Sequence, residues 1–365
     1  MDFYSTNSLS WEQLEYGTKA IMNLHYGLIH VGLPTMVDLT RDNLPNIKED
    51  NMPKNFELCK EGDVAFADAS EDTNEVAKPI EFFDLAGKNI VCGLHTIHGR
   101  DNKNKTVIGF KGYAFSSSAF HNQIRRIAQG TKIYSISTKN FSECFIGIPS
   151  KVEQTKIATL LRLIDERIAT QNKIIEDLKK LKSAITDLLF HSIADAHTIR
   201  LGEIAHITNG AGDVQDANTE HQEDWYPFFD RSEELKWFPT YSFDKEAVIY
   251  AGEGQSFYPR YYNGKFALHQ RCYAITDFAS CIIPKYCYHF MNTLNSYFVR
   301  NSVGSTVPSL RMDIFQKVEI RLPPIPKQQH ICKIIDAFYT KLEVEQRGIS
   351  ILQELKQFLL SQMFI

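Results

Sequence analysis

The sequence lacks the features of several large protein classes. Among its 365 residues no apolar run approaches the ~20 residues that a transmembrane helix needs. Its first residues, MDFYSTNSLSWEQ, do not combine a basic segment with an apolar one, as a secretory signal does. We therefore expect a cytoplasmic protein with no membrane partner.

Paired cysteines are also missing. The seven cysteines are odd in number, scattered and without a Cys-x-x-Cys pair, which favours reduced thiols over a disulfide framework. Cys92, His95 and His98 place three possible metal ligands close together in the sequence. A structural site usually needs a fourth ligand, and the second half of the chain does not repeat the set. We predict no metal site.

Motifs for nucleotide and cofactor chemistry are absent as well. No GxxxxGK[ST] loop occurs, and Gly252-Glu253-Gly254 is too short to hold phosphates. A methyltransferase that modifies DNA amino groups should carry an Asn/Asp-Pro-Pro-Tyr/Phe motif, but the one Pro-Pro pair, Pro323-Pro324, stands before an expected helix. We therefore assign no catalytic residue and no cofactor to this chain.

What the sequence does contain is two long stretches with heptad spacing, residues 152–191 and 331–363. Apolar residues at alternating steps of four and three form the seam of a coiled coil. Neither helix has a sufficiently polar seam to stand alone, so we expect an antiparallel pair. The predicted seam residues are Ile157, Leu161, Ile164, Ile168, Ile175, Leu178, Lys182, Ile331, Ile335, Phe338, Leu342, Glu345, Ile349 and Leu352.

Both stretches break the apolar pattern in the same register. Gln171 and Lys182 interrupt the first seam, and Glu345 and Lys356 interrupt the second seam at the same sequence offset. In one simple antiparallel register Lys182 faces Glu345 and Gln171 faces Lys356, which would fix the register. Alternatively, the lysine stems reach out of the seam and meet no partner.

The repeat extends beyond the helices. Residues 130–157 recur in part at the offset that relates the two seams, as in Gly130 and Gly304 or Gln154 and Gln328, and Leu94-His95 recurs as Leu268-His269. Internal repetition is strong evidence of architecture. The mixture of short strand and helix patterns predicts α+β units. The chain is thus expected to hold two copies of one unit, each a globular part followed by a long helix.

Charge is distributed in the same way in both copies. The net charge of −4 hides an acidic segment, residues 1–85 with 6 Lys/Arg and 16 Asp/Glu, before a basic one, residues 86–139 with 9 Lys/Arg and one acid. Residues 195–253 (4 bases, 13 acids) and 260–317 (7 bases, 2 acids) repeat that order. A basic surface that occurs twice favours a polyanionic partner.

Several segments carry a family resemblance. IGIPSKVEQTKIATLLRLIDERI and IRLPPIPKQQHICKIIDAFYTKL share a proline before a glutamine-containing helix start, and WEQLEYG, RLGEIAHITNG and NGKFALHQRCYAI add to the likeness. The sequence resembles the specificity (S) subunit of type I restriction–modification systems over essentially the whole chain. It departs from the pattern at Lys327-Gln328, where the first copy has Glu153-Gln154.

The resemblance implies a fold and a function. The fold would be two pseudo-symmetric target recognition domains, residues 1–150 and 195–322, separated by an antiparallel two-helix coiled coil of residues 151–194 and 323–365. Each domain would read one half of a bipartite double-stranded DNA target, and the helices would set the gap and dock two methyltransferase (M) subunits, to which restriction (R) subunits can add. The chain itself would not be an enzyme; S-adenosylmethionine would bind the M subunit, and ATP and Mg²⁺ the R subunit.

Other classes remain open at this point. They are a self-contained DNA methyltransferase or nuclease, the recognition subunit of a type II-like system, and a structural coiled-coil scaffold. Cationic, amide and aromatic side chains near turns suit phosphates and base edges, although each also suits a solvated loop or ordinary packing. The predicted DNA-binding residues are Arg100, Asn102, Lys103, Lys105, Arg125, Tyr258, Arg260, Tyr261, Lys265, His269, Gln270 and Arg271.

Overall fold

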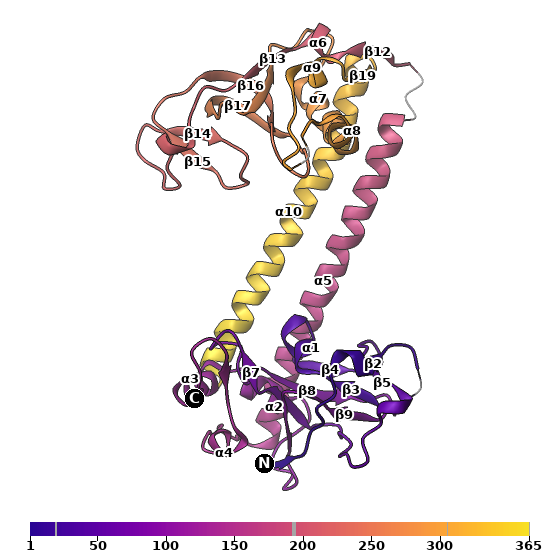
Figure 1. Ribbon diagram of the computed structural model, residues 1–365, viewed down its shortest axis with the longest axis vertical. Helices are drawn as coiled ribbons and strands as arrows, with labels where there is room; N and C mark the ends of the chain where they lie inside the picture. The colour runs from indigo at the N-terminus through magenta and orange to yellow at the C-terminus, as the bar shows by residue number, and fades with distance from the viewer. Residues whose placement is uncertain (19, 192–194, 305, 365) are drawn as a thin grey trace. The chain divides into compact units, whose positions relative to one another are not determined.

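The computed structural model describes residues 1–18, 20–191, 195–304 and 306–364, and the predicted domain limits at residues 194 and 365 lie outside them. The chain forms two units: Met1–Lys173 with Arg347–Ile365, and Ile174–Gln346. Unit 1 contains the first head, residues 1–150, and unit 2 the second head, residues 195–322 (Figure 1). Each unit also contains part of both long helices. None of the described helices combines the length and apolar character needed to cross a membrane.

The first head is built on two sheets with short helices around them. Its larger sheet has the order β1-β10-β6-β8-β4, and its smaller one β2-β5-β3-β9. The larger sheet consists of β1 (Asp2–Tyr4), β10 (Thr96–Arg100), β6 (Val64–Ala67), β8 (Pro79–Asp84) and β4 (Met36–Asp38). The other elements are β2 (Leu14–Glu15), β5 (Asn46–Ile47), β3 (Met22–Leu24), β9 (Ile90–Cys92), β7 (Ala69–Ser70), β11 (Tyr134–Ser135), α1 (Tyr26–Val31), α2 (Phe110–Phe115), α3 (Ser118–Ile127), α4 (Thr138–Phe141) and the 3-10 turns Trp11–Gln13 and Glu49–Asn51.

The second head is built on one larger sheet, with the order β13-β18-β16-β17-β14-β15. Its strands are β13 (His206–Asn209), β18 (Cys272–Thr276), β16 (Phe243–Ala251), β17 (Arg260–Leu268), β14 (Tyr226–Phe229) and β15 (Lys236–Phe238). The other elements are β12 (His197–Arg200), β19 (Glu319–Leu322), α6 (Leu201–Ile204), α7 (Pro284–Met291), α8 (Asn295–Asn301), α9 (Met312–Gln316) and the 3-10 turn Val214–Asp216. Aromatic side chains dominate its core, where Tyr250, Phe298 and Phe315 are fully buried.

The two heads have the same topology. Pairing is antiparallel along β1-β10-β6-β8 and parallel between β8 and β4. The series β13-β18-β16-β17 is likewise antiparallel, and β17 pairs with β14 in parallel. The predicted α+β heads with internal symmetry are therefore confirmed. The second head adds β15 and a longer β16–β17 hairpin, whereas the first head adds the smaller sheet.

Backbone hydrogen bonds fix which residues are equivalent. The Asp68 amide donates to the His95 carbonyl, and the Asp68 carbonyl accepts from Ile136. Gly252 makes the same two bonds with Arg271 and Leu310. Ile136 and Leu310 therefore keep the offset of the seams, whereas His95 corresponds to Arg271. The predicted equivalence of Leu94-His95 with Leu268-His269 is wrong by two residues, because the heads differ in length upstream of α2 and α7.

The two long helices are α5 (Lys151–His191) and α10 (Ile325–Gln362), each close to ~60 Å long at ~1.5 Å per residue. In unit 1, Ala158 of α5 shares a buried cluster with Leu360 near the end of α10. In unit 2, Phe190 at the end of α5 shares one with Ile331 near the start of α10. The start of one helix meets the end of the other in each unit, which confirms the antiparallel pair.

A buried glutamine attaches each long helix to its head. The Gln154 amide donates to the carbonyls of Pro149 (2.8 Å) and Lys105 (3.0 Å), and its oxygen accepts from Val107 N (2.9 Å). Gln328 repeats this arrangement at distances of 2.8 to 2.9 Å. Its partners are the carbonyls of Pro323 and Cys281 and the Ile283 amide. Both side chains are 0% exposed.

The predicted pairing of the polar seam residues is wrong. The Lys182 ammonium lies 4.0 Å from the ring centroid of Tyr339, and the Lys356 ammonium 2.6 Å from Asp165. Asp165 and Tyr339 are themselves related by the offset of the repeat, so both lysines cross to equivalent positions. Glu345 instead pairs with Lys341 one turn away along its own helix. The register differs by six residues from the predicted one, because aromatic and acidic partners outside the assumed seam receive the lysines.

Candidate nucleic-acid interface

The predicted seam residues and the predicted ligand-binding residues occupy different environments. Every predicted seam residue is buried or half-buried, including Lys182 and Glu345. Six of the apolar seam residues are almost sealed from solvent, with exposure between 0% and 8%: Leu161, Ile164, Ile175, Ile331, Ile335 and Leu342. The predicted ligand-binding residues are more varied.

The β16–β17 hairpin presents its side chains on two faces. Arg260 donates to the backbone carbonyls of Asp230 and Ser232, and its guanidinium lies 5.9 Å from the Phe229 ring centroid. On the opposite face the Tyr261 hydroxyl donates to Glu246. These two side chains hold the sheet and its neighbours in place, and alternation along β17 separates them.

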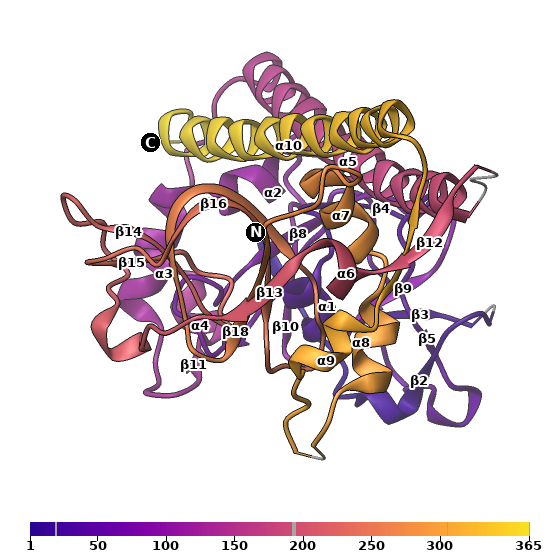
Figure 2. The same cartoon turned by 90° about the horizontal axis from the view of Figure 1, so that it is seen from above.

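Tyr261 also takes the place of an acid in the first head. Val64 pairs with Glu81 across β6 and β8, and its counterpart Val248 pairs with Tyr261. Glu81 is bound by Lys111 of α2 at 3.1 Å, and Lys285 of α7 lies 5.8 Å from the Tyr261 ring centroid. In each head a lysine of a neighbouring helix, Lys111 of α2 or Lys285 of α7, thus contacts the side chain at this position of the sheet. Seen from above (Figure 2), α7 also lies beside α10, where Lys285 and His289 both bond Asp336.

Two of the predicted ligand-binding residues in the hairpin segment reach solvent. Tyr258 is 57% exposed, and Lys265 is exposed with its ammonium 4.6 Å from the Tyr241 ring centroid. An exposed tyrosine and a cation held over an aromatic ring suit stacking and phosphate contacts.

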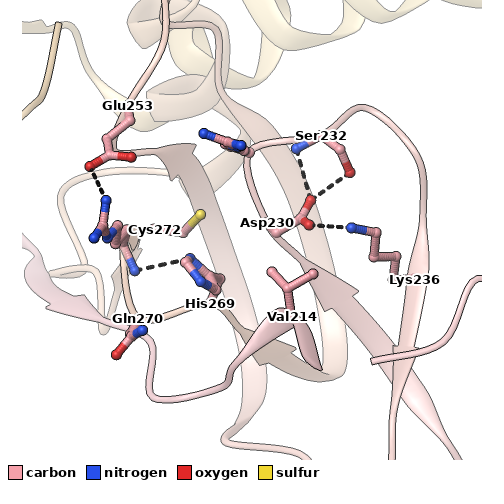
Figure 3. Close-up of a pocket in the computed structure, with 10 residues that line it drawn as sticks. Val214, Asp230, Ser232, Lys236, Glu253, His269, Gln270 and Cys272 are labelled. Carbon is pink, nitrogen blue, oxygen red and sulfur yellow. Dashed lines mark hydrogen bonds and ion pairs between the residues drawn. The ribbon is translucent and has the colours of Figure 1, made fainter. Parts of the chain in front are cut away.

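His269, Gln270 and Arg271 gather at a cavity of about 520 Å³ in the second head (Figure 3). Sequence reasoning missed their neighbours, Asp230, Ser232 and Lys236, because the β14–β15 segment belongs to the acidic part of the sequence and is distant along the chain. Register brings it close, since β14 pairs in parallel with β17. The other lining residues are Val214, Arg231, Glu253 and Cys272.

Hydrogen bonds and ion pairs organise this cavity. Asp230 accepts from Lys236 Nζ at 2.6 Å and from the Ser232 hydroxyl at 2.6 Å. Burial acts to raise the pKa of Asp230, but these bonds outweigh it and leave the pKa below the usual value. The Arg271 guanidinium bonds Glu253 at 2.7 Å, yet its side chain is 65% exposed. Arginine and lysine whose partners are carboxylates can exchange them for phosphate oxygens or base edges.

In the first head the predicted basic loop is partly a strand. Arg100 belongs to β10 and is 8% exposed. It donates to Asp63 (2.9 Å), Glu57 (2.5 Å) and the Leu58 carbonyl (2.7 Å), and lies over Tyr4. These groups occupy the guanidinium, so the structure does not present Arg100 to a ligand. Its carboxylate partners raise the pKa of Arg100 further above its usual range, although burial opposes them.

The rest of that loop is exposed. Asn102 donates to Asp2 and to the Tyr4 hydroxyl, both at 2.7 Å. Lys103 and Lys105 line a cavity of about 320 Å³ with apolar side chains that include Phe145, which is 75% exposed. A pair of lysines beside exposed apolar groups is able to hold a phosphate and pack against a sugar.

Arg125 lies apart from these lysines, on the exposed face of α3. Its guanidinium donates to the side-chain oxygens of Asn74 and Asn122. The structure therefore brings together Lys103 and Lys105 in the first head and His269, Gln270 and Arg271 in the second. It leaves Arg100 inside, commits Arg260 and Tyr261 to packing, and places Arg125, Tyr258 and Lys265 separately at the surface.

The potential metal ligands of the first head are also rearranged. His95 is exposed and bonds Asp68 at 3.1 Å, so it points away from Cys92. Cys59 takes its place beside Cys92 and His98. Sequence reasoning missed Cys59 because it is 33 residues from Cys92 in the chain.

Comparisons with known proteins identify relatives of this chain. Residues 194–357 match the family described as "Type I restriction modification DNA specificity domain". The chain is 31% identical over 165 residues to the type I restriction enzyme EcoDI specificity subunit of Escherichia coli, a match that covers 45% of this chain and 36% of that protein. The chain thus spans about a third of the length of this curated relative.

Solved structures share the fold across nearly the whole chain. A type I restriction–modification S subunit from M. genitalium has a TM-score of 0.61 at 17% identity, covering 100% of this chain and 93% of that one. A second structure, described in terms of the complex assembly and conformational transition of the type I R-M system, has a TM-score of 0.58 at 16% identity and covers 89% of each chain. At these identities the likeness establishes the fold.

Proposed function

We propose that this chain, whose residues 194–357 match the type I restriction modification DNA specificity family, is the DNA-reading specificity subunit of such a system. Each head contacts one half of a bipartite double-stranded target. Two M subunits supply methylation, and R subunits can join them. The observation that carries the proposal is the common topology of the two heads, each attached to a long helix through an equivalent buried glutamine, Gln154 or Gln328.

The basic side chains of both heads support DNA contact. Lys103 and Lys105 in the first head, and Lys265 and Arg271 in the second, are exposed cations near cavities or aromatic rings. Phosphate contacts of this kind position a protein on DNA, and amide or guanidinium groups such as Gln270 and Arg271 can read base edges.

The outer faces of the helices support partner docking. Both helices carry exposed apolar residues outside the seam: Leu163 (52%), Leu181 (50%), Val344 (58%), Ile351 (58%), Leu355 (43%) and Phe358 (61%). Exposed apolar side chains in such number on two helices are typical of a protein interface. We assign these faces to the M subunits, and we assign to the helices the task of setting the unread gap between half-sites.

Chemistry is assigned to the partners. S-adenosylmethionine would bind the M subunits, and ATP and Mg²⁺ the R subunits, so the proposed role of this chain is recognition without catalysis. Because its ligand is DNA, the proposed location is the cytoplasm. A self-contained methyltransferase and a type II-like recognition subunit are the competing functions, and the likeness to two S subunits favours the specificity role.

Reconstitution tests the proposal. The chain with its M subunits should methylate a bipartite sequence, and neither component alone should do so. Lys103→Ala and Arg271→Ala should each weaken DNA binding and lower the slope of log affinity against log salt by ~1 for every phosphate that the variant no longer neutralises. Lys54→Ala, which changes an exposed lysine in the acidic segment of the first head, is the matched control. Methylation by the chain alone would overturn the assignment, as would DNA binding that both variants leave unchanged.

A further inference from the structure

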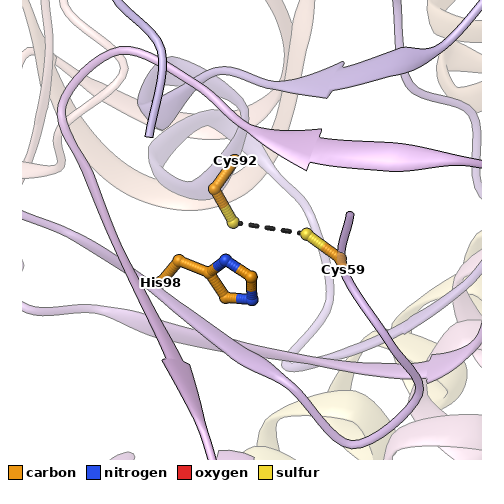
Figure 4. Close-up of side chains that lie close together, drawn as sticks. All are labelled: Cys59, Cys92 and His98. Carbon is orange, nitrogen blue, oxygen red and sulfur yellow. Dashed lines mark hydrogen bonds between the residues drawn. The ribbon is translucent and has the colours of Figure 1, made fainter. Parts of the chain in front are cut away.

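The first head contains a thiol–imidazole cluster that the proposed function does not use. Cys59, Cys92 and His98 are 5%, 2% and 0% exposed. Each offers one ligand atom, and these atoms lie within 4.8 Å of one another. The two sulfurs are 3.5 Å apart. Figure 4 shows the three side chains pointing toward one another from separate segments.

The backbone fixes the positions of these residues. Leu58 forms a bridge with Val91, and Cys59 N donates to the Ile90 carbonyl at 2.8 Å, which holds the loop before β6 against β9. Cys92 is the last residue of β9, and His98 lies in the middle of β10. Two strands, and a loop hydrogen-bonded to one of them, therefore position the three ligands.

His98 is oriented as a metal ligand would be. Its Nε2 bonds Asp63 at 2.8 Å, and Asp63 is held in turn by Arg100. Its Nδ1 is buried and has no hydrogen-bond partner among the described residues. An unpaired buried polar atom is costly. A carboxylate on one ring nitrogen fixes the imidazole and leaves the other nitrogen for a metal, as in many zinc sites.

The donor set and its charge select the metal. Sulfur and imidazole ligands suit zinc, whereas calcium and magnesium require oxygen ligands. The Sγ–Sγ distance of 3.5 Å is near the ~3.8 Å edge of a tetrahedron with ~2.3 Å zinc–sulfur bonds. Two thiolates, one neutral imidazole and Zn²⁺ sum to zero charge, so the buried site needs no further counter-charge.

We propose that Cys59, Cys92 and His98 Nδ1 bind one zinc ion, with a water molecule in the fourth position. On binding, each thiol loses its proton to solvent, and no oxidation or reduction takes place. The ion joins β9, β10 and the loop before β6, and thereby stabilises the first head. In the second head Ala274 stands at the strand position of His98, so the site is specific to one head.

Metal analysis of the full-length protein tests this site. Protein purified under reducing conditions without chelator should contain about one zinc per chain. Replacing zinc with cobalt should give sulfur-to-cobalt charge-transfer bands and the visible bands of tetrahedral cobalt. Cys59→Ser, Cys92→Ser and His98→Gln should each remove most of the metal. Cys144→Ser, which changes a half-buried thiol of the same head, should retain it.

A second measurement avoids dependence on the folding of those variants. A strong chelator added to the wild-type protein should lower the melting temperature and reduce amide protection in β9 and β10, and zinc should restore both. Reduced wild-type protein that takes up neither zinc nor cobalt would overturn the proposal, as would a disulfide between Cys59 and Cys92 in freshly purified protein. Equal metal content in Cys144→Ser and the three ligand variants would also overturn it.

Discussion

In the first head Asp63, His98 and Arg100 form a buried polar network across β6 and β10. The equivalent positions of β16 and β18 hold Ala247, Ala274 and Thr276, and the core around them is apolar. Where Glu81 meets Lys111 in the first head, Tyr261 meets Lys285 in the second. One topology thus accommodates either ionic or aromatic side chains at equivalent interior positions. Strand pairing uses backbone hydrogen bonds and leaves the side chains free to vary.

The largest effect should come from exchanging a whole head. If the heads read separately, replacing residues 200–320 with those of a relative will change one half of the methylated target and leave the other half intact. The exchange preserves Gln328 and its helix, and the partners of Gln328 that lie in the exchanged head are backbone atoms of Cys281 and Ile283, which a relative with the same fold also supplies. Sequencing the methylated sites in cells that also express the M subunits is the measurement, and a change in both halves would refute modularity.

Removing the charge at the centre of the ionic network should destabilise the first head alone. Asp63→Ala leaves Arg100 buried with only Glu57 as an acidic partner and removes the partner of His98. Breaking a buried pair in this way costs roughly 3 kcal/mol or more. The measurement is hydrogen exchange resolved by peptide, in which protection should fall in unit 1 and persist in unit 2.

A matched control is available in the same head. Asp68→Ala removes a partner of the exposed His95, and surface pairs contribute under ~1 kcal/mol. If Asp68→Ala and Asp63→Ala lowered protection equally, the contrast between a buried ionic core and an apolar one would lose its basis.

The two heads should respond alike to loss of the buried glutamine that attaches each of them to its long helix. Gln154→Ala or Gln328→Ala leaves one buried amide donor and two carbonyls without the side chain that satisfied them. Each substitution should cost about 1–3 kcal/mol. Fraying should appear in amide exchange at the start of α5 in one case and of α10 in the other. Gln353→Ala, which changes an exposed glutamine of α10, is the neutral control.

These elements show what sequence could and could not predict. Repetition at a constant offset identified the helices, Gln154 with Gln328, and Gly130 with Gly304, whose positive φ angles of 137° and 100° favour glycine in both copies. In the earlier part of each head the sequence offset between equivalent residues is no longer constant. Loops there tolerate insertions without a change in topology. The burial of Arg100 could not be predicted, because a positive charge beside a turn does not reveal that it pairs with Asp63, which is far along the chain.

The smallest effect should be a difference in acid response between the heads. Burial raises the pKa of Glu81 despite Lys111 and the amides of Gly109 and Gly112, so its folded-state pKa lies above its unfolded value. Protonation of Glu81 therefore favours the folded first head. This contribution to stability is lost as pH rises from the unfolded-state pKa of Glu81 through its folded-state pKa.

Asp230 has the opposite sign, since Lys236 and Ser232 hold its folded pKa below the unfolded value against the effect of burial. It stabilises the second head above the unfolded pKa, and this contribution disappears as pH falls through the folded value. Acid unfolding followed by peptide-resolved exchange should show Asp230→Asn flattening the acid loss in unit 2. Glu81→Gln should remove the opposing gain in unit 1. Identical acid profiles for both variants would contradict the opposite directions in which the folded protein shifts the pKa values of Glu81 and Asp230.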